Sequence, residues 1–414
     1  MYTSKLGLGL ACLLMCACDF PHDALRELRE THSQVVRKGA SAARAGAPAM
    51  SDAGHALDAS TPPQPPNCGP TLQCPDDCGA AFDPEESEDA GSGEARTRAV
   101  SVLTFNRTTC ALLEDRTVRC WGSNSNGELG DGTFNDSARP VRVQQLEGVV
   151  QLDVGLLRAC AVVEGGRLRC WGDNIWDVLR VGDELDHNLP VTAQGVEHAA
   201  QVSLGEHQTC VRYTDGTLEC WGYPHDTDLD VQGVSDVASV EAGYFLSTAT
   251  LVDGSVRSWG LNSLAGPVDV SASRAVSSGY GFVCVLTQDA SVSCHGSYSV
   301  HESVDRVDGP VPGLSAVASI SSGFEHSCAV TRAGKVYCWG RNNRGQLGDG
   351  GTEYSVAARE VANLEQVVEV TCGREHSCAR KSDGSIYCWG SNDVGELGDG
   401  TTRERHSPVA VLVM

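Results

Sequence analysis

Ser322–Gly350 has the sequence SGFEHSCAVTRAGKVYCWGRNNRGQLGDG, and Cys372–Gly400 repeats it closely as CGREHSCARKSDGSIYCWGSNDVGELGDG. The Trp-Gly pair of this unit recurs along the chain, with His295-Gly296 in the one slot where tryptophan is missing. Seven units follow, marked by Trp121, Trp171, Trp221, Trp259, His295, Trp339 and Trp389. Successive units are 36 to 50 residues apart, a period typical of solenoids, propellers and repeat arrays.

Each unit contains short apolar runs separated by Gly and Asp, a pattern that favours β-strands. In the sixth unit, Thr331 and Lys335 flank a three-residue turn whose last position, Gly334, should adopt a left-handed conformation. Glycine fills the same position as Gly166, Gly216, Gly254 and Gly384. Arg116 and Ala290 are the two exceptions, and at these turns we expect strain or a different closure.

This turn sets a register in which Cys328 lies directly opposite Cys338. Directly opposed antiparallel residues have Cα atoms roughly 4.5 to 5.5 Å apart, within disulfide range. The same register pairs Cys110 with Cys120, Cys160 with Cys170, Cys210 with Cys220, Cys284 with Cys294, and Cys378 with Cys388. In the fourth unit both cysteines are replaced together, by Thr248 and Ser258.

We therefore predict six disulfides, each closing a small loop and contributing about 2 to 3 kcal/mol. The alternatives are small buried thiols or a metal site. A metal would need four converging ligands, whereas these cysteines come in isolated pairs, so we expect no metal.

These motifs together carry a family resemblance. The G-x-x-H-S-C-A segment, the turn glycine, the Trp-Gly pair and N-x-x-G-[QE]-L-G-D-G resemble the repeat of the regulator of chromosome condensation superfamily, over residues 98–414. The resemblance implies an all-β fold, a seven-bladed β-propeller of four-stranded blades. Short strands in units that cannot bury their own faces independently favour a closed ring. We expect Pro408–Val413 to pair near Ala99–Leu103 and close it.

The N-terminal segment indicates export. Residues 1–18 contain one Lys and an apolar run, Leu6–Met15, that is too short to span a bilayer. Their end, Met15-Cys16-Ala17-Cys18, resembles a bacterial lipoprotein signal with lipid attachment at Cys18; a simple secretory signal is the alternative. Both predict an exported protein, either in the cell envelope as an outer-membrane or surface lipoprotein or secreted, where disulfides form.

Residues 19–97 are rich in Ala, Ser, Pro, Asp and Glu and cannot bury enough apolar area to order themselves. We predict a disordered tether between the signal and the propeller. Cys68, Cys74 and Cys78 lie in this tether, where one local bridge with one leftover thiol is favoured over a zinc site, which would lack a fourth ligand.

Candidate chemistry is sparse. His326 and His376 share a repeat position filled elsewhere by Thr108, Arg158, Gln208, Leu246 and Phe282, which favours a structural hydrogen-bonding position lining the ring. Cys372 is expected to be a small buried thiol on an inner strand. Each Gly-Asp-Gly loop offers one carboxylate, too few for calcium, and lacks the Lys-[Ser/Thr] of a phosphate loop. We find no catalytic constellation and predict no cofactor; a glycan-processing enzyme would need paired carboxylates in one pocket.

The loops suggest where a partner binds. Units one, six and seven keep the full Gly-[Gln/Glu]-Leu-Gly-Asp-Gly loop, whereas units two to five do not. Loops at the rims of a propeller carry recognition, so the variable ones mark a specific surface. Trp176, in the second unit, is the single tryptophan outside the repeat position and our candidate contact; the alternative is that it packs beneath its own loop.

Charge limits the choice of partner. The chain has 31 Lys and Arg against 54 Asp and Glu, a net charge of −23, which repels nucleic acid and anionic lipid. We therefore predict a non-catalytic, monomeric, protein-binding propeller that is exported or surface-anchored, touches a membrane only through its lipid, and binds an unidentified protein or cell-envelope ligand. The resemblance implies two alternatives: nucleotide exchange on a small GTPase, or enzyme inhibition as in the related secreted propeller that inhibits β-lactamases.

Overall fold

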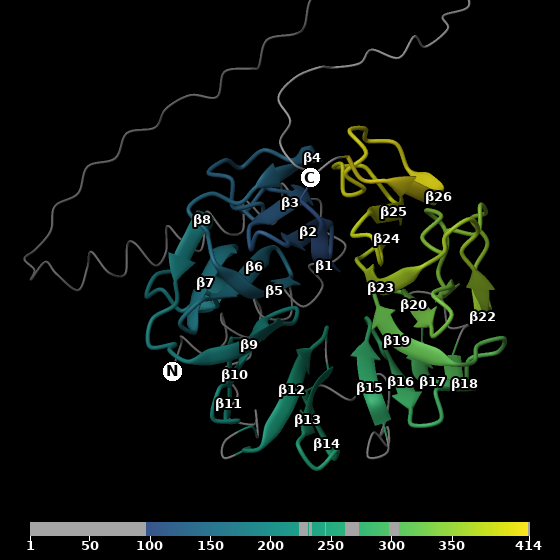
Figure 1. Ribbon diagram of the computed structural model, residues 1–414, viewed down its shortest axis with the longest axis horizontal. Helices are drawn as coiled ribbons and strands as arrows, with labels where there is room; N and C mark the ends of the chain where they lie inside the picture. Colours follow the sequence, from purple (N-terminus) through teal and green to yellow (C-terminus); the bar gives the residue numbers. More distant parts are fainter. Residues whose placement is uncertain are drawn as a thin grey trace, which may run out of the picture. The chain divides into compact units, whose positions relative to one another are not determined.

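The computed structural model describes residues 97–222, 231, 234–244, 246–260, 273–297 and 306–412. The predicted signal peptide, the lipid attachment at Cys18, residues 19–96 of the predicted tether, and Cys68, Cys74 and Cys78 lie outside these residues. Within the described residues the elements are strands, apart from one 3-10 turn, η2 (Ile175–Asp177). The predicted seven-bladed β-propeller is confirmed, and each blade is one antiparallel sheet of consecutive strands (Figure 1).

The seven blades follow one another along the chain. Blades 1 and 2 contain β1 (Ala99–Phe105), β2 (Thr108–Leu113), β3 (Val118–Gly122) and β4 (Ser137–Arg142), then β5 (Val149–Gly155), β6 (Arg158–Val163), β7 (Arg167–Gly172) and β8 (His187–Thr192). Blades 3 and 4 contain three described strands each, namely β9 (Ala199–Leu204), β10 (Gln208–Tyr213) and β11 (Leu218–Gly222), then β12 (Val237–Ala242), β13 (Leu246–Leu251) and β14 (Val256–Gly260).

The last three blades have four strands each, as the resemblance implied. Blade 5 contains β15 (Ser273–Ser278), β16 (Phe282–Thr287), β17 (Val292–Ser297) and β18 (Arg306–Pro310). Blades 6 and 7 contain β19 (Val317–Ser322), β20 (His326–Thr331), β21 (Val336–Gly340) and β22 (Ser355–Glu360), then β23 (Val367–Cys372), β24 (His376–Lys381), β25 (Ile386–Gly390) and β26 (Arg405–Ala410).

The first strand of every blade faces a central channel (Figure 1). The channel has a volume of about 310 Å³ and is lined by β1, β5, β9, β12, β15, β19 and β23. Its lining includes three carboxylates, Asp153, Glu241 and Glu369, together with many hydroxyl and amide side chains, and no lysine, arginine or histidine among the described residues. The channel is therefore lined by acidic and polar side chains, and Glu369 is paired with Arg380 at 2.8 Å.

The disulfides within the blades are confirmed. The second and third strands of a blade pair in the register that the turn predicts, and the cysteines joined in each of six blades have Cα atoms 4.1 Å apart. Thr248 and Ser258 of blade 4 are opposed in the same register. Arg116 and Ala290 take left-handed φ values of 64° and 65°, as the glycines do at the other turns.

Two kinds of hydrogen bond, neither of which we anticipated from the sequence, join neighbouring blades. In the first, the buried tryptophan of one blade donates its indole N–H to the preceding blade. The acceptors are Glu396 O for Trp121, Glu128 O for Trp171, Val178 O for Trp221, Gln346 O for Trp389, and the side-chain oxygen of Gln208 for Trp259. The repeated tryptophan thus fastens its blade to the one before it.

In the second, a polar side chain on the inner strand of one blade accepts the backbone N–H of the next inner strand. We call these bonds the inner ring. Its pairs are Asp153 with Leu204 N, Ser203 with Ala242 N, Ser277 with Ser322 N, Ser321 with Cys372 N, and Thr371 with Thr104 N, at 2.7 to 3.1 Å. The hydroxyls of the channel wall therefore hold blades together as well as facing water.

The expected pairing of Pro408–Val413 with Ala99–Leu103 is wrong. β26 pairs with β25 inside blade 7, and β1 pairs with β2 inside blade 1. Blades 1 and 7 each form a complete four-stranded sheet within one stretch of chain, so neither lends a strand to the other. Blades 1 and 7 meet instead through side chains, including Thr371 of the inner ring and a cluster that packs Val409 and Val411 against Ala99 and its neighbours.

Candidate functional site

The loops that connect first to second strands and third to fourth strands lie at one end of the ring, because the strands of each blade run antiparallel. We call this end the loop rim, and the opposite end, with the turns between second and third strands, the hairpin rim. The loop rim carries the loops of variable sequence and is therefore the candidate binding surface.

The same set of hydrogen bonds, which we call the loop frame, shapes the long loops of this rim in blades 1, 2, 6 and 7. In blade 7, the Asn392 side chain accepts the backbone N–H of Leu397 and donates to Asp399, which also accepts the backbone N–H of Thr401. The aspartate of the Gly-Asp-Gly motif thus closes its own loop. Its pKa is held below the usual range, against the effect of burial, by hydrogen bonds from Thr401, Arg405 and Asn392.

The loop of blade 2 keeps these hydrogen bonds but differs in the residues between them. Asn174 accepts the N–H of Leu179 and donates to Asp183, as Asn392 does to its partners in blade 7. However, Trp176, Asp177 and Arg180 have φ values of 60°, 52° and 56°. Left-handed backbone costs a non-glycine residue about 1 to 2 kcal/mol. These three residues therefore carry a conformational cost that glycine would avoid. Such backbone strain often marks functional positions.

Trp176, the predicted contact residue, lies between two blades rather than only over its own loop. Its partly buried ring meets the ring of His207 of blade 3 edge-on, with centroids 5.5 Å apart. Burial, followed by the charge of Arg158, lowers the pKa of His207, so its imidazole is neutral at neutral pH. Trp176 therefore forms part of the rim surface where blades 2 and 3 meet.

A buried arginine fixes the turn that carries His207. Arg158 is 1% exposed and donates to the carbonyl oxygens of Gly205, Glu206 and Gln208 of blade 3 at 3.0 to 3.2 Å. Burial lowers the pKa of Arg158 to about 10, so it stays charged. Burial also raises the pKa of Glu206 to about 7. The turn beneath Trp176 is thus rigidly placed.

Aromatic side chains from four blades meet near the channel at this rim. Phe105 of blade 1 stacks on Tyr244 of blade 4 with centroids 4.5 Å apart, and Tyr280 of blade 5 stacks on Phe324 of blade 6 at 4.3 Å. Tyr244 and Phe324 meet edge-on at 5.6 Å, and the guanidinium of Arg374 from blade 7 lies over Phe324 at 4.9 Å. This cluster brings together parts of the rim that are far apart in the sequence.

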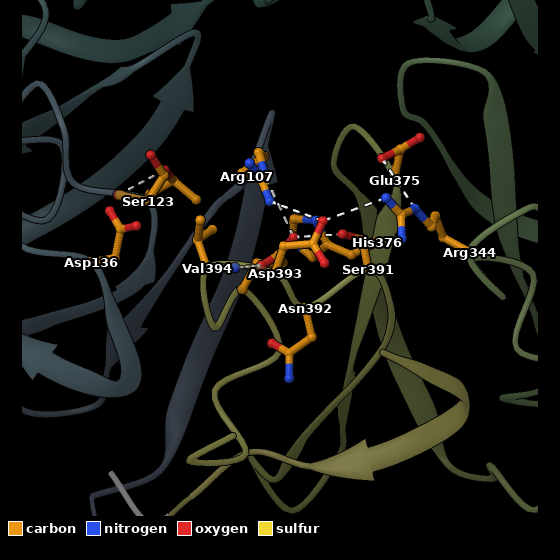
Figure 2. A network of polar contacts seen from close by, with 12 residues as sticks. Arg107, Ser123, Asp136, Arg344, Glu375, His376, Ser391, Asn392, Asp393 and Val394 are labelled. Carbon is orange, nitrogen blue, oxygen red and sulfur yellow. Dashed lines mark hydrogen bonds and ion pairs between the residues drawn. The ribbon is translucent and has the colours of Figure 1, made fainter. Parts of the chain in front are cut away.

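A charged network lies farther out on the rim, where blades 6, 7 and 1 meet. Arg107 of blade 1 and Arg344 of blade 6 both point toward Asp393 of blade 7, at 3.4 and 3.5 Å (Figure 2). Arg344 also approaches Glu404 at 3.3 Å and Glu375 at 4.0 Å. Asp393 is half exposed, and exposed ion pairs add little stability, so this network defines the charge pattern of the surface more than it holds the ring.

The two predicted structural histidines hold neighbouring blades together. His326 Nε2 lies 2.8 Å from Ser377 Oγ of blade 7, and His376 Nε2 lies 2.9 Å from Thr109 Oγ1 of blade 1. Both imidazoles are buried, and burial lowers the pKa of each to about 3. The His326–Ser377 pair resembles a base and nucleophile, but it is shut off from solvent and the same arrangement recurs with Thr109. Both pairs therefore serve the blade interfaces.

Cys372 is a free, buried thiol on β23, and burial raises its pKa to about 12. One ligand atom each of His326, Cys328 and Cys372 lie within 4.8 Å of one another, a spacing that suits a metal ion. Cys328, however, is bonded to Cys338, and a disulfide sulfur is a poor metal ligand. In the oxidised protein this cluster is therefore packing at the interface of blades 6 and 7.

Comparison with known proteins follows from this geometry. Two family models, both described as regulator of chromosome condensation (RCC1) repeat, match the chain, one at residues 106–128, 317–346 and 367–396 and the other at 333–380 and 383–413. The matches fall mainly in blades 1, 6 and 7, which keep the complete loop. The chain is thus a propeller in which six blades each contain an internal disulfide and in which the loop rim varies in sequence. Over the matched residues it is similar to the regulator of chromosome condensation (RCC1) repeat.

The chain is also similar to solved structures, all at low identity. The structure of Kap60 bound to yeast RCC1 (Prp20) matches at a TM-score of 0.60 and 17% identity, over 81% of this chain and 91% of that chain. The ectodomain of the receptor kinase CR4 from Physcomitrella patens matches at a TM-score of 0.49 and 20% identity, over 72% and 74%. No curated protein sequence matches the chain. In the part of the chain that the structure describes, no helix has the length and apolarity to cross a membrane.

Proposed function

We propose that this chain is an exported, non-catalytic propeller that binds another protein through its loop rim, with Trp176 at the centre of the contact. The observation that carries the proposal is the loop of blade 2. It keeps the hydrogen-bonded frame of its repeat yet places Trp176, Asp177 and Arg180 in left-handed conformations at the surface. Glycines at two of these positions in blade 1, Gly127 and Gly130, avoid that strain.

The surroundings of Trp176 suit protein recognition. Tryptophan and arginine are enriched among residues that dominate protein interfaces, and Arg180 lies in the same loop. Leu185, farther along this loop, is 56% exposed. The loop is anchored by Asn174 and rests on a turn fixed by Arg158, so little ordering would be needed on binding. The same fold occurs in a protein complex, that of yeast RCC1 with Kap60.

Export and lipid attachment at Cys18 are part of this proposal. The six disulfides support an oxidising address, since such bonds persist outside the cytoplasm. The net charge of −23 favours a partner other than nucleic acid. The partner would therefore be a protein of the cell envelope or of the surrounding medium.

Site-specific photocrosslinking in the producing cells tests the proposal. A photoreactive residue replaces Leu185 on the loop rim and, as the matched control, Val252 on the hairpin rim, which is 74% exposed. We expect a discrete protein adduct from position 185, none from position 252, and loss of the adduct when Trp176→Ala is added. An adduct of equal yield from both positions, or one insensitive to Trp176→Ala, would refute binding through this rim.

A further inference from the structure

Among the described residues, the interface between blades 4 and 5 lacks both the inner-ring hydrogen bond and the tryptophan hydrogen bond that join other neighbouring blades. In the inner ring, the position that accepts an N–H from the next blade is occupied by Ser203 in blade 3, Ser277 in blade 5 and Ser321 in blade 6. In blade 4 it is Glu241. Among the described residues, Glu241 forms no hydrogen bond or ion pair, and its carboxylate faces the channel. Its side chain is exposed to the channel, where limited solvation within the ring, followed by the negative charge of Asp153, raises its pKa.

The tryptophan that fastens one blade to the preceding blade is also missing here. Blade 5 has His295 in that slot, and its ring pairs within its own blade, with Ser293 at 3.2 Å and Asp308 at 3.7 Å. In blade 4, by contrast, Trp259 donates to Gln208 of blade 3. The 4–5 interface therefore lacks two independent repeated contacts.

The interface between blades 1 and 2 shows that losing one device is tolerated. It too lacks an inner-ring bond, because Leu103 holds the acceptor position. Trp171, however, donates to Glu128 O, and the apolar cluster across this interface contains 14 buried side chains. Among the described residues, the cluster between blades 4 and 5 contains four, Leu246, Val276, Val283 and Val285. One hydrogen bond, from Ser278 Oγ to Leu246 O at 3.0 Å, and an edge-on contact between the rings of Tyr244 and Tyr280, with centroids 6.4 Å apart, also cross it.

Blade 4 is the blade without a disulfide, since Thr248 and Ser258 stand at the paired positions. The hairpin of β13 and β14 therefore lacks the covalent constraint that the other six blades have. The missing inner-ring bond, the missing tryptophan and the missing disulfide all affect blade 4 or its interface with blade 5, where the apolar cluster formed by the described residues is also small. Local opening occurs where buried apolar contacts and hydrogen bonds are fewest.

We propose that the propeller opens reversibly along the 4–5 interface while its other interfaces remain closed. Opening separates β12 and β13 from β15 and gives solvent, or a ligand, lateral access to the acidic channel at Glu241. The proposal is independent of the rim function, because Trp176 lies between blades 2 and 3. It concerns the ring and not the partner.

Thiol labelling of the intact, oxidised full chain tests this proposal with a matched pair of buried reporters. Val276→Cys places a thiol on β15 at the 4–5 interface, and Val370→Cys places one at the equivalent position of β23, at the 6–7 interface. The two valines are 6% and 7% exposed. We expect the thiol at position 276 to react at least about tenfold faster, because labelling of a buried thiol requires opening.

Exchanging the inner-ring residues should transfer this behaviour. Glu241→Ser gives Ser278 N–H an acceptor and should slow labelling at position 276 about fivefold, the effect of one net hydrogen bond. Ser321→Glu removes the acceptor of Cys372 N–H and should speed labelling at position 370. Equal labelling rates at the two reporters would overturn the proposal, as would a faster rate at position 370. If either substitution prevents folding, the labelling rates of Val276→Cys and Val370→Cys in the otherwise unchanged chain still test the proposal.

Discussion

His376 should make this protein sensitive to acid in a way that one substitution removes. Its imidazole is buried at the interface of blades 7 and 1, bonded to Thr109, and its pKa falls from 6.5 to about 3. The folded protein therefore binds fewer protons at this site than the unfolded chain. For a group whose folded pKa is lowered, stability is lost as pH falls below the unfolded value.

The size of this effect depends mainly on the unfolded chain. At about pH 5 the folded imidazole is still neutral, while the unfolded one is protonated 1.5 pH units below its ordinary pKa of 6.5. Holding it neutral costs about 2 kcal/mol at that pH and nearly nothing at about pH 7.5. Because any folded pKa well below 5 gives the same cost, the result does not depend on how far burial shifts it.

His376→Gln is the matched replacement, since Gln208 fills the same repeat position in blade 3 and accepts a hydrogen bond from Ser247 at 2.8 Å. Glutamine can bond Thr109 but does not titrate. Denaturant unfolding at about pH 7.5 and about pH 5 should show the unsubstituted protein losing about 2 kcal/mol more than the variant between the two conditions.

The unsubstituted protein must be compared with His376→Gln because other groups change the free energy of unfolding with pH in the opposite direction. Glu128 and Glu206 have their pKa raised to about 7 by burial, so they favour folding as pH falls from 7 toward 4.5. The whole curve therefore mixes opposing contributions, which cancel when His376→Gln is subtracted. An identical pH dependence in both proteins would refute the reasoning and show that His376 is solvated or charged in the fold.

Three further outcomes are expected. Thr248→Cys with Ser258→Cys should add a seventh disulfide and about 2 to 3 kcal/mol of stability, seen by non-reducing mass spectrometry and unfolding; a pair that stays reduced would contradict the register. Ala290→Gly should stabilise blade 5 by roughly 0.5 to 1 kcal/mol, because φ is 65° there, whereas Gly334→Ala should destabilise blade 6. Cys18→Ser should abolish metabolic labelling by a fatty acid, and persistent labelling would rule out this acceptor.

The register of each blade could be predicted because it depends only on local chemistry. The left-handed position at Gly334 fixes the turn, and the turn fixes which residues oppose one another, including Cys328 and Cys338. Ring closure could not be predicted in the same way. Whether the last strand joins blade 1 or blade 7 depends on interfaces between distant segments, and the apolar pattern of Pro408–Val413 suits both arrangements.

The contacts between blades were missed although the sequence contains their signal. Ser277, Ser321 and Thr371 occupy one repeat position on the inner strands. A side chain that only faced water in the channel would not need a hydroxyl at that position in every such blade. The repeated tryptophans mark the unit in the sequence, and a buried indole N–H also needs an acceptor, which the preceding blade supplies for Trp171 and its equivalents. The arrangement around Asp393 joins three blades and has no counterpart in local sequence.

A ring built by such repeated contacts makes each departure from the repeat informative. Replacing a residue that forms a repeated contact between two blades should cost stability only at that interface. Repeat arrays gain most of their energy from contacts between nearest neighbours. Trp176 replaces a residue of an otherwise intact loop frame, so its cost falls on the surface of blade 2. Glu241 replaces an inner-ring hydroxyl, so its cost falls on the 4–5 interface. The two departures therefore point to separate properties, recognition at the rim and opening of the ring, which substitutions can alter independently.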